Sequence, residues 1–160
     1  TFLETIHLIQ KQVPELKAFI IGKDQGEQRA ILDRIKDLKL EHLVHLTGFR
    51  TDIPKILPHA DLFLFTSKTE GLGTSILDAF ASKIPVVATP AGGIPELVIH
   101  EQTGLLGKIK NPESLAVLAL KILNDKSLAT DLIKGANQHA QNFTKEQTAI
   151  KTLEHYEDLL

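Results

Sequence analysis

Residues 61–88 read DLFLFTSKTEGLGTSILDAFASKIPVVA, and their pattern indicates the fold class. An apolar run at 61–65 is followed by a turn with two glycines, and then by apolar residues at helical spacing over 74–82. A second apolar run begins at Pro85. Short apolar runs separated by a helix are typical of parallel strands, because parallel neighbours need a long crossover connection.

The same alternation continues on both sides of this stretch. The pattern predicts strands at 17–21, 43–49, 61–65, 85–88 and 103–106. It predicts helices at 1–12, 26–39, 52–59, 74–82, 93–99, 112–125, 128–141 and 145–159. The strands read as nearly continuous apolar runs, which is typical of a sheet covered on both faces. We therefore expect a Rossmann-like α/β domain over residues 1–160, with a mostly parallel sheet and helices on both faces.

Length and composition narrow the class of protein further. The 160 residues are 42% hydrophobic and 24% charged, which indicates a globular domain, and the formal net charge of −2 excludes a strongly basic nucleic-acid-binding surface. The chain has no cysteine, so we expect neither disulfides nor thiolate metal sites. It has no methionine and begins within a predicted helix, so we expect a piece of a longer protein, with a processed N-terminus as the alternative. A cytoplasmic location is the default expectation.

The glycine-containing turn is the first candidate site. Gly71 and Gly73 let the backbone approach a ligand closely, and the following helix offers the N–H groups of Thr74, Ser75 and Ile76. Such a helix start favours a phosphate or diphosphate. It is neither a P-loop nor a full dinucleotide fingerprint, because Ile76 stands where the third glycine would be. A plain strand-to-helix turn remains the alternative.

Two acidic residues flank this turn. Glu70 precedes the glycines, and Asp78 lies one turn into the helix, four residues after Thr74. Ionised carboxylates are pure acceptors and suit the hydroxyl groups of a sugar or a ribose. The alternative is that both are solvated surface charges. A glycosidase pair is rejected, because one acid is better used on ribose and no site for water attack can be argued.

From Asp61 to Gly107 the sequence resembles the C-terminal domain of glycosyltransferase family 4, whose members are retaining GT-B enzymes that use nucleotide sugars. The resemblance rests on an acid, a Gly-x-Gly turn, a second acid, an Ala-rich helix and a Pro-Val-Val-Ala segment, here Glu70 to Ala88. It continues through GGIPEL at 92–97 and TGLL at 103–106, and upstream through TGF at 47–49. It covers most of the chain.

The resemblance implies a role for each matching residue. Donor-sugar contacts fall on Glu70, Gly71, Leu72, Gly73 and Gly93, and diphosphate contacts fall on Gly73, Thr74 and Ser75. Asp78 takes the place of the family's usual glutamate on the ribose and is one methylene shorter. The loop at Arg50 would face the nucleobase. No catalytic residue is assigned within the chain.

The resemblance also implies what surrounds this domain. The chain lacks the strand with which the family's domain opens, so neighbouring sheet edges should be exposed, and it lacks the N-terminal acceptor domain. The expected partners are a nucleotide-sugar donor and that missing domain, with no nucleic acid. Any association with the inner membrane face would run through the missing part. No cofactor and no metal are expected, and the seven histidines show no ligand spacing.

The sequence thus predicts the donor-binding domain of a retaining hexosyltransferase, inactive on its own, that passes a hexosyl group to an acceptor such as a glycan or a lipid. One alternative is a sugar-nucleotide epimerase or a phosphorylase-like GT-B relative, although no lysine stands out as the one that a phosphorylase cofactor needs. Another is a dehydrogenase-like or non-catalytic nucleotide-binding module, which the absent third glycine disfavours.

Overall fold

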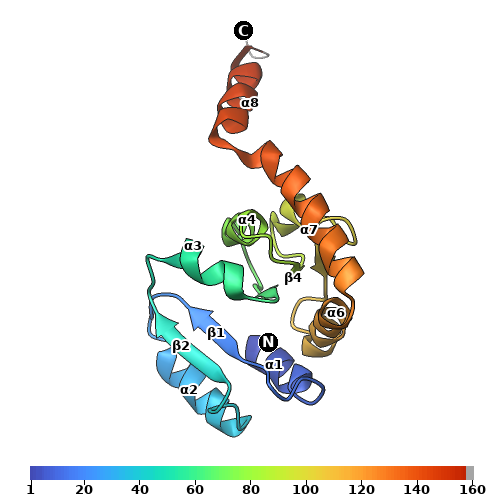
Figure 1. Cartoon of the computed structure of the whole chain (residues 1–160). Coiled ribbons are helices and arrows are strands. Elements are labelled where there is room, and N and C mark those ends of the chain that lie inside the picture. Colours follow the sequence, from blue (N-terminus) through green and yellow to red (C-terminus); the bar gives the residue numbers. More distant parts are fainter. Residues whose placement is uncertain (158–160) are drawn as a thin grey trace.

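The computed structural model describes residues 1–157 and has the alternating order that the sequence predicts (Figure 1). The strands are β1 Ala18–Ile21, β2 Val44–Gly48, β3 Phe63–Phe65, β4 Val86–Ala88 and β5 Leu105–Leu106. The helices between them are α1 Phe2–Ile9, α2 Gln28–Asp37, α3 Ile53–Ile56 with the 3₁₀ turn η1 Leu57–His59, α4 Ser75–Ala81 and α5 Ile94–Leu97. The C-terminal helices are α6 Pro112–Asn124, α7 Lys126–Ala140, η2 Gln141–Phe143 and α8 Lys145–Glu157.

All strand pairs are parallel, as predicted, but they form two sheets. One sheet has the order β1-β2 and the other the order β3-β4-β5. Strands β1 and β3 do not pair with each other, which agrees with the expectation of exposed sheet edges. Each of these two strands therefore has a neighbouring strand on one side only.

The core lies on both sides of β4. Val86, Val87 and Ala88 are fully buried, which explains why this strand reads as an uninterrupted apolar run. One cluster joins β4 to α4 and α5, and another joins it to α6 and α7. A third cluster holds α1 and the β1-β2 sheet against α6. Helix α6 thus connects the two halves of the fold.

Several predicted boundaries shift for local reasons. Helix α7 begins at Lys126 and not at 128, because the Asp125 side chain accepts hydrogen bonds from the N–H groups of Ser127 and Leu128. The strand predicted at 103–106 is shortened to Leu105–Leu106. The buried Thr103 hydroxyl donates instead to the carbonyl of Leu97 and accepts from the N–H of Ile99.

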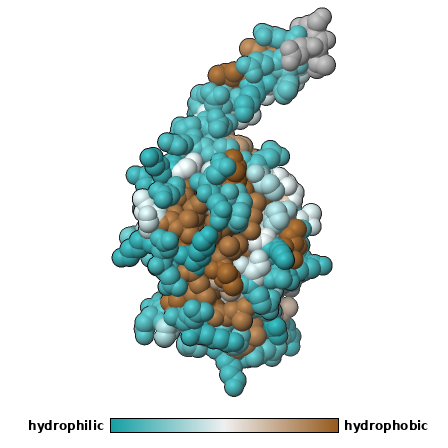
Figure 2. All heavy atoms as spheres, turned by 90° about the vertical axis from the view of Figure 1, so that its right-hand side faces the viewer, coloured by the Kyte–Doolittle hydropathy of each residue, from teal (hydrophilic) through white to brown (hydrophobic). Residues whose placement is uncertain are grey.

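Helix α8 extends away from the body of the domain, as Figures 1 and 2 show. It carries exposed apolar side chains at Ile150, Leu153 and Tyr156, and none of its described residues is buried. The end of the helix predicted to 159 lies outside the described residues. Within residues 1–157 no helix is both long and apolar enough to cross a membrane.

Candidate functional site

The loop between β3 and α4 is packed onto the turn at Gly92 and Gly93. The N–H of Gly93 donates to the carbonyl of Gly71 with a 2.7 Å N···O distance. Gly92 has a positive φ of 55°, and a Cβ there would overlap the carbonyl oxygen of Glu70. Both glycines are therefore needed for the close approach of two backbones. This contact places the GGIPEL segment beside the Gly-x-Gly turn.

A buried threonine holds the other end of the same loop. The Thr89 hydroxyl donates to the carbonyl of Ser67 at 2.6 Å, and its N–H donates to the carbonyl of Phe65. Thr89 follows β4 directly, so it ties the loop after β3 to the end of the neighbouring strand. The sequence reading missed Thr89, Ser67 and the requirement at Gly92. Of these features, the sequence indicated only the adjacent glycines Gly92 and Gly93.

Gly73 is required both by conformation and by space. Its φ is 77°, in the left-handed region that side chains disfavour. A Cβ there would lie 3.3 Å from side-chain atoms of Phe65, Ile76 and Ile94. The backbone turn into α4 therefore requires glycine at this position.

The start of α4 offers fewer N–H groups than the sequence suggests. The N–H of Ile76 donates to the carbonyl of Gly73 at 2.9 Å, so the expectation that it is open to a ligand is wrong. Such three-residue bonds are common where a helix tightens at its first turn. Within residues 1–157 no protein hydrogen bond uses the N–H of Thr74 or of Ser75. These two donors are the ones left for an anion.

The two acids that flank the turn in the sequence have different surroundings. The Glu70 carboxylate accepts hydrogen bonds from the Ser67 hydroxyl at 3.2 Å and from the Gly71 N–H at 3.3 Å. Asp78 projects from α4 and is exposed. Ser67 and Asp78 both line one large cavity. Glu70 does not line it, but accepts a hydrogen bond from Ser67, which does.

Arg50 follows β2, and Asp52 holds its side chain. Two hydrogen bonds, of 2.8 Å and 2.6 Å, join the guanidinium to the Asp52 carboxylate. This contact raises the pKa of Arg50 and lowers that of Asp52. Asp52 is therefore not a side-chain cap of α3, contrary to the expectation, because its oxygens are engaged with Arg50. The backbone groups of residues 48–50 are therefore the part of this loop that remains available to contact a nucleobase.

One cavity of about 1460 Å³ brings several of the candidates together. Arg50, Ser75 and Asp78 line it, together with polar neighbours at Thr66 and Ser67. Glu70, Gly71, Leu72, Gly73, Thr74 and Gly93 are not among its lining residues. These residues outside the cavity are connected to Ser67 and Ser75, which line it, through the backbone of the loop between β3 and α4. The polar residues lie after β2 and β3 or on α4, at the carboxyl ends of the strands, where α/β sheets bind ligands.

The histidines form no metal site within the described part of the chain, where no group of three His, Cys, Asp or Glu side chains is placed to hold an ion. His45 stacks on Phe19 instead, with ring centroids 5.3 Å apart.

Comparisons with known proteins show the family and the fold of this chain. Residues 1–139 match the family model described as glycosyl transferases group 1. The chain is 29% identical to N-acetyl-alpha-D-glucosaminyl L-malate synthase of Bacillus anthracis over 160 residues, which are 98% of the chain and 42% of that protein. It superposes with a TM-score of 0.85 on Anabaena Alr3699/HepE in complex with UDP, at 28% identity, covering all of this chain and 45% of that one.

A third comparison is with the C-terminal domain of LpcC, a glycosyl transferase group 1 family protein of Francisella tularensis. The TM-score is 0.78 at 25% identity, and the match covers 88% of this chain and 76% of that one. The fold and its loop of glycines thus define a GT-B glycosyltransferase domain.

The chain belongs to the glycosyl transferases group 1 family. The predicted enzyme class, a glycosyltransferase, is confirmed by the curated relatives. The chain spans less than half the length of the first curated relatives that it matches.

Proposed function

We propose that this chain is the donor-binding domain of a hexosyltransferase, and that it holds a nucleotide-diphosphate sugar at the loop between β3 and α4. The observation that carries the proposal is the pair of unpartnered N–H groups, on Thr74 and Ser75, beside the carboxylates of Glu70 and Asp78. The bound UDP of the Anabaena relative supports a nucleoside diphosphate as the ligand class.

Each group has a distinct part in binding. The N–H groups of Thr74 and Ser75 hold the diphosphate, and they stabilise the negative charge that gathers on it as the bond to the sugar breaks. Asp78 accepts from the ribose hydroxyls, and the backbone of the 48–50 loop contacts the base. Glu70, with Gly71, Leu72, Gly73 and Gly93, surrounds the donor sugar.

Isothermal titration calorimetry with nucleoside diphosphates and the matching nucleotide sugars tests these roles. Asp78→Ala should weaken binding of both ligand types about tenfold or more, because it removes charge-assisted hydrogen bonds to a group that both contain. Glu70→Ala should weaken the nucleotide sugar about tenfold and the bare diphosphate much less. Asp33→Ala removes an exposed carboxylate from α2 and should change neither, which makes it the matched control.

Equal losses for both ligand types in both variants would contradict the division of roles. No measurable binding of any nucleoside diphosphate by the unmodified full-length protein would contradict the site itself.

We further propose that transfer retains the anomeric configuration and needs no metal ion. In that reaction the donor bond ionises towards an oxocarbenium-like state, and N–H groups stabilise the leaving diphosphate. The linkage formed by the full-length protein, read by NMR, tests retention, and an inverted product would exclude it. Loss of binding on adding EDTA would exclude a metal-free site.

The remaining proposal concerns the rest of the polypeptide. We propose that residues 1–160 form the C-terminal part of a two-domain enzyme whose N-terminal domain binds the acceptor. The likeness to the C-terminal domain of LpcC supports this placement, as does the coverage of less than half of the relatives. Transfer by the full-length protein and none by residues 1–160 is the expected pattern. Turnover by residues 1–160 alone would contradict it.

A further inference from the structure

The Glu70 carboxylate is held by donors from its own loop. Among the residues that the structure describes, it accepts two hydrogen bonds, from the Ser67 hydroxyl at 3.2 Å and from the Gly71 N–H at 3.3 Å. It takes part in no ion pair among the same residues. The orientation of this carboxylate therefore depends on the shape of the loop backbone that carries its donors.

The backbone of Ser67 is held by a side chain from a different part of the fold. Thr89 directly follows β4, it is fully buried, and its hydroxyl donates to the carbonyl of Ser67 with a 2.6 Å O···O distance. The carbonyl of Phe65 lies 3.4 Å from the same hydroxyl and already accepts from the N–H of Thr89. Since a hydroxyl has one proton and the shorter contact is the stronger, this proton is used on Ser67.

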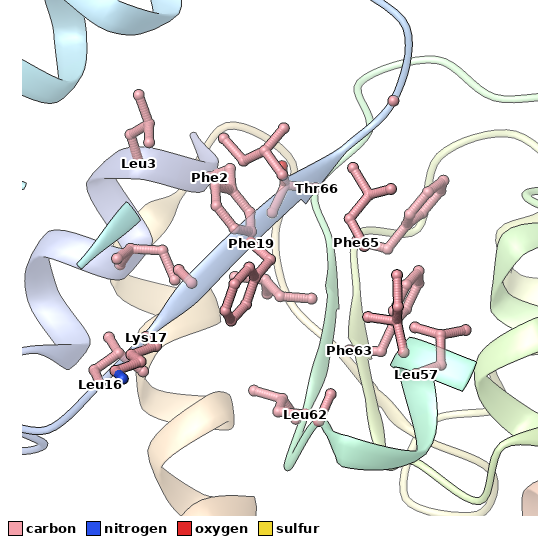
Figure 3. A pocket seen from close by; sticks show the side chains of 18 of the residues that line it. Phe2, Leu3, Leu16, Lys17, Phe19, Leu57, Leu62, Phe63, Phe65 and Thr66 are labelled. Carbon is pink, nitrogen blue, oxygen red and sulfur yellow. The ribbon is translucent and has the colours of Figure 1, made fainter. Parts of the chain in front are cut away.

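The two hydrogen bonds connect the end of β4 to the candidate site. The Thr89 hydroxyl fixes the main chain of Ser67, and the Ser67 hydroxyl donates to the carboxylate of Glu70. Ser67 lines the large cavity together with Phe65 and Thr66, the two residues before it, which Figure 3 shows. A buried side chain that touches no part of the cavity thus acts on a carboxylate at the site.

The later part of the loop is held without Thr89. The N–H of Gly93 donates to the carbonyl of Gly71, and the N–H of Ile76 donates to the carbonyl of Gly73. Neither bond involves Thr89 or its partner. The start of α4, which carries the proposed diphosphate donors, should therefore keep its shape when the Thr89 hydroxyl is removed.

We propose that Thr89 is a positioning residue for the donor sugar, which acts through Ser67 on the Glu70 carboxylate and leaves the diphosphate subsite unaffected. This inference rests on the proposed function, in which Glu70 accepts from hydroxyl groups of the sugar. A glutamate side chain loses much rotamer freedom when a ligand orders it. A carboxylate that is already held in place therefore binds the sugar more tightly than a free one.

Calorimetric titration of the full-length Thr89→Val protein tests the proposal, because valine keeps the shape of the side chain and removes the hydroxyl. The probes are UDP, GDP and ADP with UDP-glucose, GDP-mannose and ADP-glucose, and the comparison uses the pair that the unmodified protein binds most tightly. Thr89→Val should weaken the nucleotide sugar about fivefold and the bare diphosphate less than about twofold. Thr89→Ser, which keeps the hydroxyl, should restore both affinities to within about twofold.

A double-mutant cycle separates this indirect action from a general loss of structure. If Thr89 acts through Glu70, Thr89→Val should cause no further loss of nucleotide-sugar binding in a Glu70→Ala protein, so the two losses are not additive. Additive losses would overturn the proposal. Equal losses for the nucleotide sugar and the bare diphosphate would also overturn it.

Thr103→Val is the matched control. Thr103 is also buried, and its hydroxyl donates to the carbonyl of Leu97 at 2.9 Å, in a different loop. Both valine variants should lower the Tm, since each loses the hydrogen bond of a buried hydroxyl. Only Thr89→Val should change the ratio of the two affinities. The same change of ratio in Thr103→Val would mean that the ratio follows stability, and would overturn the proposal.

Ser67→Ala gives the same test if Thr89→Val does not fold. It removes the hydroxyl that donates to Glu70 and leaves the buried threonine in place. It should weaken the nucleotide sugar selectively and cause no further loss in a Glu70→Ala protein. Unselective or additive losses in this variant would equally overturn the proposal.

Failure of this inference can be told from failure of the proposed function. No binding of any probe by the unmodified protein would remove both. A selective loss in Glu70→Ala, together with no loss or an unselective loss in Thr89→Val, would remove the role of Thr89 alone.

Discussion

Replacing Gly92 with alanine is expected to lower the Tm of the protein by about 10 °C and to abolish measurable nucleotide-sugar binding. Its φ of 55° alone costs an alanine about 1–2 kcal/mol. The new Cβ would also overlap the carbonyl oxygen of Glu70, which is backbone and cannot rotate away. A clash of this kind adds about 1–3 kcal/mol, and a domain of this size loses roughly 2–4 °C for each kcal/mol.

Nucleotide-sugar binding should be lost because of the same clash between the new Cβ at position 92 and Glu70. Relief of the clash requires the Glu70–Gly71 backbone to move, and the Gly93 N–H bond to Gly71 would be lost with it. Glu70 would then leave its place beside Ser67. The prediction is checked by thermal unfolding followed by circular dichroism and by calorimetry with the nucleotide sugar.

Gly71→Ala is the matched control for stability. A Cβ at Gly71 would meet no atom within 4 Å, and its φ is not positive. Its Tm should stay within about 2 °C of the unmodified protein, as is usual for surface substitutions. A Gly92→Ala protein with an unchanged Tm would show that the two loops do not pack as described.

Gly135→Ala should produce the second large loss, a fall in Tm of about 6–8 °C. Gly135 lies inside α7, and a Cβ there would overlap the carbonyl oxygen of Gln102. Alanine favours the helix by about 1 kcal/mol, so only a tertiary clash can make this change harmful. Helix α7 must then move away from the 101–104 turn and from α4, against which it packs.

Thermal unfolding of Lys134→Ala separates this clash from a general effect of alanine in α7. Lys134 is the exposed neighbour of Gly135, and its replacement should change the Tm by less than about 2 °C. A Gly135→Ala protein as stable as Lys134→Ala would contradict the close approach of α7 to Gln102.

Much of the element order could be read from periodicity. The apolar runs that became β1 and β4 were bounded within one residue. Strand β4 is fully buried, and a strand covered on both faces needs apolar side chains on both. The observed ends of helices and strands differ from the predicted ones where a side chain forms hydrogen bonds with backbone groups. Asp125 extends α7 by capping it, and Thr103 draws its segment out of β5.

The candidate site was predictable only in part. Residue type alone pointed to Gly71, Gly73 and the two acids. Glycine permits a close approach of the backbone, and an ionised carboxylate can only accept hydrogen bonds. Thr89 gave no signal, since its hydroxyl matters only through the carbonyl of Ser67, 22 residues away. The hydrogen bond from the N–H of Ile76 to Gly73 likewise follows from how tightly α4 begins.

Local sequence patterns were sufficient to predict the α/β class, the order of strands and helices, and the loop that carries the glycines and acids. These features depend on residues near one another in the chain, whose hydrophobic spacing and turn chemistry act locally. The three-dimensional arrangement was needed to show that Gly92 packs on Glu70 and that the Thr89 hydroxyl donates to the carbonyl of Ser67. Such contacts depend on how distant backbones approach one another, and that distance is set by the whole core.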